Sequence, residues 1–171
     1  VARSQYRAKI HVTLAGTGPA EVDLKTLAVK LGVRATIGRV TDDQLHDLYA
    51  AADVFVQCSR VELEGMSALE AMAAGCPTLL NRTETSALSE LIQDPLGAFT
   101  DEAPNILTQK LDALLSNPDA RQFLTDRNQA FALTRRHEDS AVQLANLYRH
   151  TLLGESNFVD GTRVATDRQA S

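Results

Sequence analysis

Short apolar segments rich in β-branched residues alternate with amphipathic segments between residues 10 and 100, and this alternation constrains the fold most strongly. Strands are expected at 10–16, 33–40, 53–59, 76–81 and 96–100, and helices at 21–31, 45–52, 66–74 and 85–92. The segment DVFVQCS is apolar enough to be a strand buried on both faces, as in parallel sheets. We therefore expect an α/β fold, a Rossmann-like three-layer sandwich with a mostly parallel sheet.

Several residues mark the expected helix ends. Thr41 and Gln44 have the spacing of a capping box, and Gly32 is expected to end the helix that precedes it. Pro19 is expected to be the first residue of that same helix. Its apolar stripe consists of Leu24, Leu27, Ala28 and Leu31.

After residue 104 the pattern is helical. Helices are expected at 104–116, from Pro118 onward, and at 141–153, where Ala141, Leu144, Ala145, Tyr148 and Leu152 share one stripe. The segment 154–171 is polar and aperiodic, and we expect a mobile tail. The predicted organisation is one domain, 1–153, followed by this tail.

Composition excludes several function classes. The 171 residues carry a formal net charge of −5, and their small basic cluster, Arg135 to His137, is too small for a polyanion groove, so no nucleic-acid partner is expected. No apolar run approaches the roughly 20 residues of a membrane span. Cys58 and Cys76 lie in apolar surroundings and are expected to be buried free thiols in a reducing compartment. No metal-ligand spacing is present, so neither a metal nor another cofactor is expected.

The segment ELEGMSALE holds the sharpest candidate site. If a helix begins near Gly65, the amides of Gly65, Met66 and Ser67 lack intrahelical partners and can bind a phosphate or diphosphate. Glu70, one turn further on, can accept two hydrogen bonds from a vicinal diol such as ribose, and Glu62 can reach a sugar beyond the phosphates. An ordinary helix start remains the alternative, because glutamate is common there for dipole reasons alone.

A second glycine-bearing turn, AGTGP, leaves two interpretations open. It departs from a dinucleotide-binding fingerprint, because Glu21 stands where the third small residue is needed. Either it is a tight strand-to-helix turn, or Gly16, Thr17 and Gly18 leave backbone open to a ligand. Both glycine turns follow strands, which places them at the edge where parallel sheets bind ligands.

The stretch SRVELEGMSALEAMAAGCPTLL resembles the signature of retaining glycosyltransferases with the GT-B fold, group 1 or family 4-like. The resemblance covers roughly residues 8–153 and implies their C-terminal, nucleotide-sugar-binding domain. It implies that Glu62 is catalytic and contacts the transferred sugar, and that Glu70 holds the ribose. Gly65, Met66 and Ser67 would donate to the diphosphate, Gly16 would face the donor cleft, and Arg39 and Val40 would border the base.

The same resemblance implies that the domain is incomplete at its N-terminal end. The family's first strand and helix, with an Arg/Lys pair for the diphosphate, and its acceptor-binding domain are expected to be missing. Because that strand is central, its loss would leave a gap between the strands at 10–16 and 53–59, or force them to pair. We expect the isolated chain to lack transferase activity.

The resemblance implies that the intact enzyme transfers a sugar from a nucleoside-diphosphate sugar to an acceptor, with retention of configuration. The enzyme is expected to be a hexosyltransferase of glycan biosynthesis. Expected partners are the nucleotide sugar and an acceptor domain or partner chain, through which any peripheral membrane association would occur. The expected location is cytoplasmic. Two alternatives remain: a non-catalytic nucleotide-binding chain of a split glycosyltransferase, docking through the helix at 140–152, and a nucleotide-sugar epimerase-like module.

Overall fold

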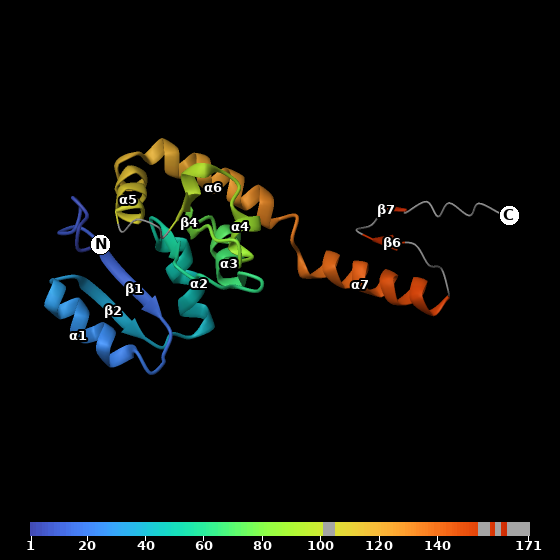
Figure 1. Cartoon of the computed structure of the whole chain (residues 1–171), viewed down its shortest axis with the longest axis horizontal. Helices are drawn as coiled ribbons and strands as arrows, with labels where there is room; N and C mark the ends of the chain where they lie inside the picture. Colours follow the sequence, from blue (N-terminus) through green and yellow to red (C-terminus); the bar gives the residue numbers. More distant parts are fainter. Residues whose placement is uncertain (101–104, 154–157, 160–161, 164–171) are drawn as a thin grey trace. The chain divides into compact units, whose positions relative to one another are not determined.

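The computed structural model describes residues 1–100, 105–153, 158–159 and 162–163. The chain forms two compact units, Val1–Ala132 and Leu133–Ser171. The strands of the first unit are β1 (His11–Ala15), β2 (Arg34–Gly38), β3 (Phe55–Gln57), β4 (Thr78–Asn81) and β5 (Ala98–Phe99). Its helices are α1 (Glu21–Leu31), α2 (Asp42–Ala51), α3 (Met66–Ala73), α4 (Leu88–Leu91), α5 (Ile106–Ser116) and α6 (Pro118–Ala132), with a 3₁₀ turn η1 (Pro95–Gly97) (Figure 1).

The strands lie in two parallel sheets, which confirms the α/β class but divides the expected single sheet. β1 pairs with β2, and β4 pairs with β3 on one side and β5 on the other. Direct pairing of β1 with β3, one of the two alternatives expected from the sequence, is not observed, because the two strands belong to different sheets. Figure 1 shows β1, β2 and α1 as one group, beside the remaining elements of the first unit.

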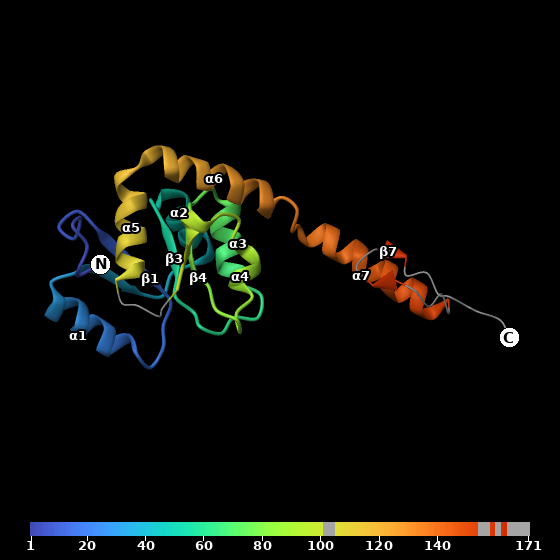
Figure 2. The same ribbon diagram turned by 45° about the horizontal axis from the view of Figure 1, so that its top comes forward.

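Helices cover both faces of the β3–β5 sheet, which gives the expected three layers. Consecutive residues of β4, Leu79 and Leu80, are fully buried and point to opposite faces. Leu80 packs with residues of α3 and α4, whereas Leu79 packs with residues of α5 and α6. Figure 2 shows α3 and α4 on one side of β4 and α5 on the other. The core of this unit therefore lies on both sides of β4.

The segment before β1 is attached to α5. The Ser4 hydroxyl donates to Asp112 Oδ1, and the Gln5 amide donates to Asp112 Oδ2 at 3.1 Å. Ser4 is buried, and Ile10 packs against the cluster that contains Leu79. These contacts place the beginning of β1 next to the β3–β5 sheet although the two sheets share no ladder.

The helix α1 follows its local signals only in part. Gly32 ends it with a left-handed φ of 59°, as predicted, and the capping box of Thr41 and Gln44 is present at α2. The helix begins at Glu21, however, and Pro19 lies in the turn before it. None of its residues is buried, and its predicted stripe stays accessible, because the helix packs on a two-stranded sheet alone.

The two cysteines differ in environment. Both are free thiols, as expected, and Cys76 is buried beside Tyr49 and Ala71. Cys58 is exposed, which corrects the expectation of burial. It directly follows Gln57, the last residue of β3, so its side chain lies past the paired part of the strand.

The second unit contains α7 (His137–Leu152) and the antiparallel pair β6 (Phe158–Val159) and β7 (Thr162–Arg163). The stripe predicted for residues 141–152 is exposed along α7. Apart from β6 and β7, the predicted tail at 154–171 lies outside the described residues, so a domain boundary at 153 stays a prediction. None of the helices in the described ranges has the length and apolar character needed to cross a membrane.

Candidate functional site

The start of α3 is an uncapped helix end at which the N-cap, Gly65, is itself buried. As a glycine, this residue has no side chain that could accept a hydrogen bond from the first amides of the helix. The first amides to donate back to the Gly65 carbonyl are those of Ala68 and Leu69, at 2.9 and 3.1 Å, so the amides of Met66 and Ser67 precede the first intrahelical bond. Both residues are exposed. The geometry expected for an anion site is thus present, and the roles of these amides stay predictions.

Gly65 is required by packing against α4. Its φ is 73°, in the left-handed region. A Cβ at this position would lie 2.7 Å from Leu91 Cδ1 and 3.0 Å from Leu88 Cδ2, two buried side chains of α4. The two buried leucines of α4 therefore explain why this position holds a glycine.

Glu62 lies beside this helix start and is held at both its backbone and its side chain. Its carbonyl accepts from the Ala87 amide at 2.9 Å, and it forms an isolated bridge with Ser86. Its Cγ lies 3.9 Å from where a Gly65 Cβ would be. Gln57 Nε2 donates to Glu62 Oε2 at 2.9 Å, so β3 and the segment before α4 together position the carboxylate.

Glu70 is fixed by α2. It follows Met66 by four residues, which places both on one face of α3. The Tyr49 hydroxyl donates to Glu70 Oε2 at 3.2 Å. Tyr49 is buried and packs edge-on against Phe55, with their ring centroids 5.7 Å apart. The exposed carboxylate of Glu70 is therefore attached to a rigid aromatic pair.

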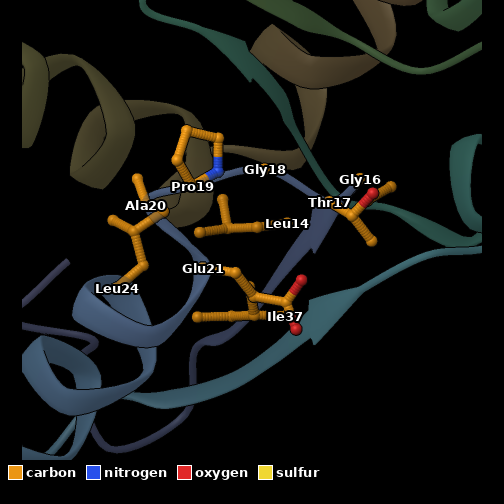
Figure 3. A pocket seen from close by; sticks show the side chains of 10 residues that line it. Leu14, Gly16, Thr17, Gly18, Pro19, Ala20, Glu21, Leu24 and Ile37 are labelled. Carbon is orange, nitrogen blue, oxygen red and sulfur yellow. The ribbon is translucent and has the colours of Figure 1, made fainter.

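The glycine turn after β1 borders a cavity of about 310 Å³ with a largely apolar lining. Leu14 of β1, Ile37 of β2 and Leu24 of α1 form its floor, and Gly16 to Ala20 form its rim (Figure 3). A Cβ at Gly16 or Gly18 would meet no atom within 4 Å. The backbone of this turn is thus open, which is compatible with both interpretations of AGTGP, and a ligand at Gly16 stays a prediction.

Arg39 and Val40 follow β2 at the same sheet edge. The Gly16 amide donates to the Gly38 carbonyl at 2.8 Å, so the glycine turn lies beside these two residues. Arg39 is exposed and Val40 is half-buried. Thr41, the next residue, caps α2. The helix α2 therefore begins beside the predicted base-binding residues and carries Tyr49, which in turn contacts Glu70.

Comparison with known proteins gives the family of this chain. The family model described as glycosyl transferases group 1 matches residues 1–131. The chain belongs to this family.

Two curated glycosyltransferases are similar in sequence to this chain. A GDP-mannose-dependent alpha-(1-6)-phosphatidylinositol dimannoside mannosyltransferase of Mycobacterium tuberculosis is 32% identical over 72% of the chain and 32% of its own length. The alpha-monoglucosyldiacylglycerol synthase of Streptococcus pneumoniae is 30% identical over 67% of the chain and 26% of its own length. The chain thus spans about a third or less of these relatives.

Solved structures confirm the GT-B glycosyltransferase fold. The catalytic domain of cholesterol-alpha-glucosyltransferase from Helicobacter pylori aligns with a TM-score of 0.75 at 30% identity, over 79% of this chain and 85% of that domain. The sucrose-phosphate synthase from Thermosynechococcus elongatus aligns with a TM-score of 0.73 at 23% identity, over 84% and 38% of the two chains, which supports the fold alone.

Two residues of the candidate site are not predicted from the sequence. The sequence places Tyr49 only within the helix expected at 45–52, and Gln57 only within the strand expected at 53–59. Their contacts with Glu70 and Glu62 cross between elements that are distant in sequence. The polar side chain of Gln57, at the end of an otherwise apolar strand, is the one sequence signal that could have indicated such a contact.

Tyr49 gives a testable pH dependence. Burial, together with the neighbouring Glu70 carboxylate, raises the pKa of Tyr49 from 10.0 to about 12. As the pH rises, the unfolded chain therefore loses the hydroxyl proton of Tyr49 at a lower pH than the folded chain does. The contribution of Tyr49 to stability is complete below pH 10 and declines as the pH rises toward 12.

We expect the stability difference between the parent chain and Tyr49→Phe to shrink over this interval. Urea unfolding followed by circular dichroism at several pH values measures it. A difference that does not change with pH would contradict the assigned role of the Tyr49 hydroxyl.

Proposed function

We propose that this chain is the donor-binding domain of a retaining glycosyltransferase, which in the intact enzyme transfers a hexose from a nucleoside-diphosphate sugar to an acceptor. The observation that carries the proposal is the start of α3. The amides of the exposed residues Met66 and Ser67 precede the first intrahelical hydrogen bond, and they are accompanied by two carboxylates, Glu62 and Glu70, each held by a neighbouring side chain.

The diphosphate would lie against these amides, with Gly65 as a further donor. Helix-end N–H groups and the helix dipole favour negative charge, and they require no rearrangement as the leaving diphosphate gains charge. This interaction supplies the stabilisation that other enzymes obtain from a metal ion, so the proposal includes no metal and no other cofactor.

The sugar rings on either side of the diphosphate would meet the two carboxylates. Glu70 keeps acceptor positions free beside its bond from Tyr49, and a carboxylate can accept both hydroxyls of a ribose. Glu62, which precedes the helix start in the chain, would contact the transferred sugar near its reacting carbon.

The base would lie toward the other sheet, bordered by Arg39 and Val40. Gly16 would line the cleft there, since its turn is open and adjacent to the end of β2. An acceptor-binding domain, supplied by the rest of the protein or by a partner chain, completes the proposed enzyme.

Thermal unfolding with added nucleotides tests the proposal. GDP, UDP, GDP-mannose and UDP-glucose are each added at millimolar concentration. We expect at least one diphosphate to raise Tm, because a ligand at 100 times its Kd stabilises the folded state by about 2.7 kcal/mol. Guanosine and uridine serve as matched controls and should give little shift, because they lack the phosphates that the α3 amides would hold. If no nucleotide shifts Tm and calorimetry detects no binding, the donor-binding function is wrong.

A further inference from the structure

Gln57 is a polar residue at the end of β3. The residues beside it on the same face of the sheet are apolar. Its partner in register is Leu80, and Phe55 precedes it by two residues. Both neighbours belong to the apolar cluster beneath α3. Gln57 Oε1 is buried and has no hydrogen-bond partner in the part of the chain that the structure describes. A buried acceptor without a donor is destabilising, so an unbranched apolar residue would serve packing better.

The amide nitrogen of Gln57 accounts for this polar residue. It donates to Glu62 Oε2 at 2.9 Å, while the Leu63 amide donates to Glu62 Oε1 at 3.2 Å. The opposite orientation of the Gln57 amide would place its oxygen against a carboxylate oxygen, with no proton between them. The carboxylate thus sets the orientation of the amide, and the amide restrains the carboxylate.

A neutral donor restrains a carboxylate without neutralising it. Lysine or arginine at this position would form an ion pair with Glu62 and offset its negative charge. Glutamine is neutral and adds no positive charge beside the carboxylate. A carboxylate has about four lone-pair positions, and the bonds from Gln57 and Leu63 use two of them. Glu62 can therefore still accept hydrogen bonds from sugar hydroxyls.

We propose that Gln57 is a positioning residue that holds the Glu62 carboxylate toward the sugar of the bound donor. The proposal rests on the proposed function, because Glu62 meets a sugar only if the diphosphate lies at the start of α3. Gln57 acts through Glu62, so its effect is confined to the sugar and leaves the nucleotide contacts unchanged.

Calorimetry on the full chain tests this with two ligand pairs, GDP with GDP-mannose and UDP with UDP-glucose. The measured quantity is the affinity for the sugar nucleotide relative to the free nucleotide. In Gln57→Met we expect this ratio to fall by about tenfold, the size of a hydrogen-bond effect on a charged group, while the Kd of the free nucleotide is unchanged.

A double-variant cycle identifies the route of the effect. Glu62→Ala should lower the same ratio, and adding Gln57→Met to Glu62→Ala should lower it no further. Tm of Gln57→Met should equal or exceed that of the parent, because the unpaired buried oxygen is removed. Gln93→Met is the matched control, since the Gln93 nitrogen donates to the Leu91 carbonyl instead, and it should leave the ratio unchanged.

The possible results separate the two proposals. If Glu62→Ala changes the ratio but Gln57→Met does not, the role of Gln57 is wrong and the donor-binding function stands. The same conclusion follows if Gln57→Met weakens the free nucleotide equally and lowers Tm, which is the result of a purely structural role. If neither variant changes the ratio, Glu62 does not meet the sugar. If the parent chain binds none of the four ligands, the proposed function itself fails.

Discussion

Replacing Gly65 with alanine is expected to lower the free energy of unfolding of the Val1–Ala132 unit by about 3 kcal/mol. Two effects add. The φ of 73° is strained for any residue with a Cβ, and the new methyl group would lie 2.7 Å from Leu91 and 3.0 Å from Leu88. Both leucines are buried in the cluster under α3, so neither can move without disturbing its neighbours.

Thermal unfolding measures this effect, and Tm should fall by roughly 10 °C. The control is Gly18→Ala in the turn after β1, where a Cβ would meet nothing within 4 Å. Its effect on the free energy of unfolding should stay within about 0.5 kcal/mol. A Gly65→Ala chain as stable as the parent would show that α3 and α4 do not pack as described.

Replacing Glu70 with glutamine is expected to weaken binding of GDP or UDP about tenfold. The variant keeps the size of the side chain and one oxygen, but it removes the charge that strengthens two hydrogen bonds from a ribose diol. Because Glu70 is exposed on α3 and its partner Tyr49 can still donate to the remaining oxygen, the fold should be preserved.

Calorimetry at fixed ionic strength gives the two Kd values, and circular dichroism confirms that the fold is kept. Asp126→Asn, at an exposed position of α6, makes the same change in net charge and should bind like the parent. Equal affinities for Glu70→Gln and the parent would remove Glu70 from ribose binding while leaving the family membership untouched.

Local signals in the sequence predicted most elements of the first unit. The capping box at Thr41 and the left-handed glycine at Gly32 operate within a few residues, so they can be read without tertiary information. Pro118 likewise begins α6 as predicted. The helix start at Glu21 rather than Pro19 was missed, because the turn that contains Pro19 is also held by a bond from the Glu21 amide to the Gly18 carbonyl.

The amphipathic pattern was less reliable as a guide to burial. The α1 stripe has the spacing of a core-facing helix, yet α1 has no buried residue. Periodicity reports which residues share a face, but burial depends on whether another element covers that face. The division of the strands between two sheets decides this, and it follows from pairings between segments far apart in the chain.

The sequence by itself determined the alternation of strands and helices, the family, and the glutamates at the two ends of the α3 start, because these depend on residue type and spacing. The tertiary structure alone decided what holds those glutamates and why Gly65 is a glycine. Tyr49, Gln57, Leu88 and Leu91 reach the site from other elements, and such contacts form only when the chain packs.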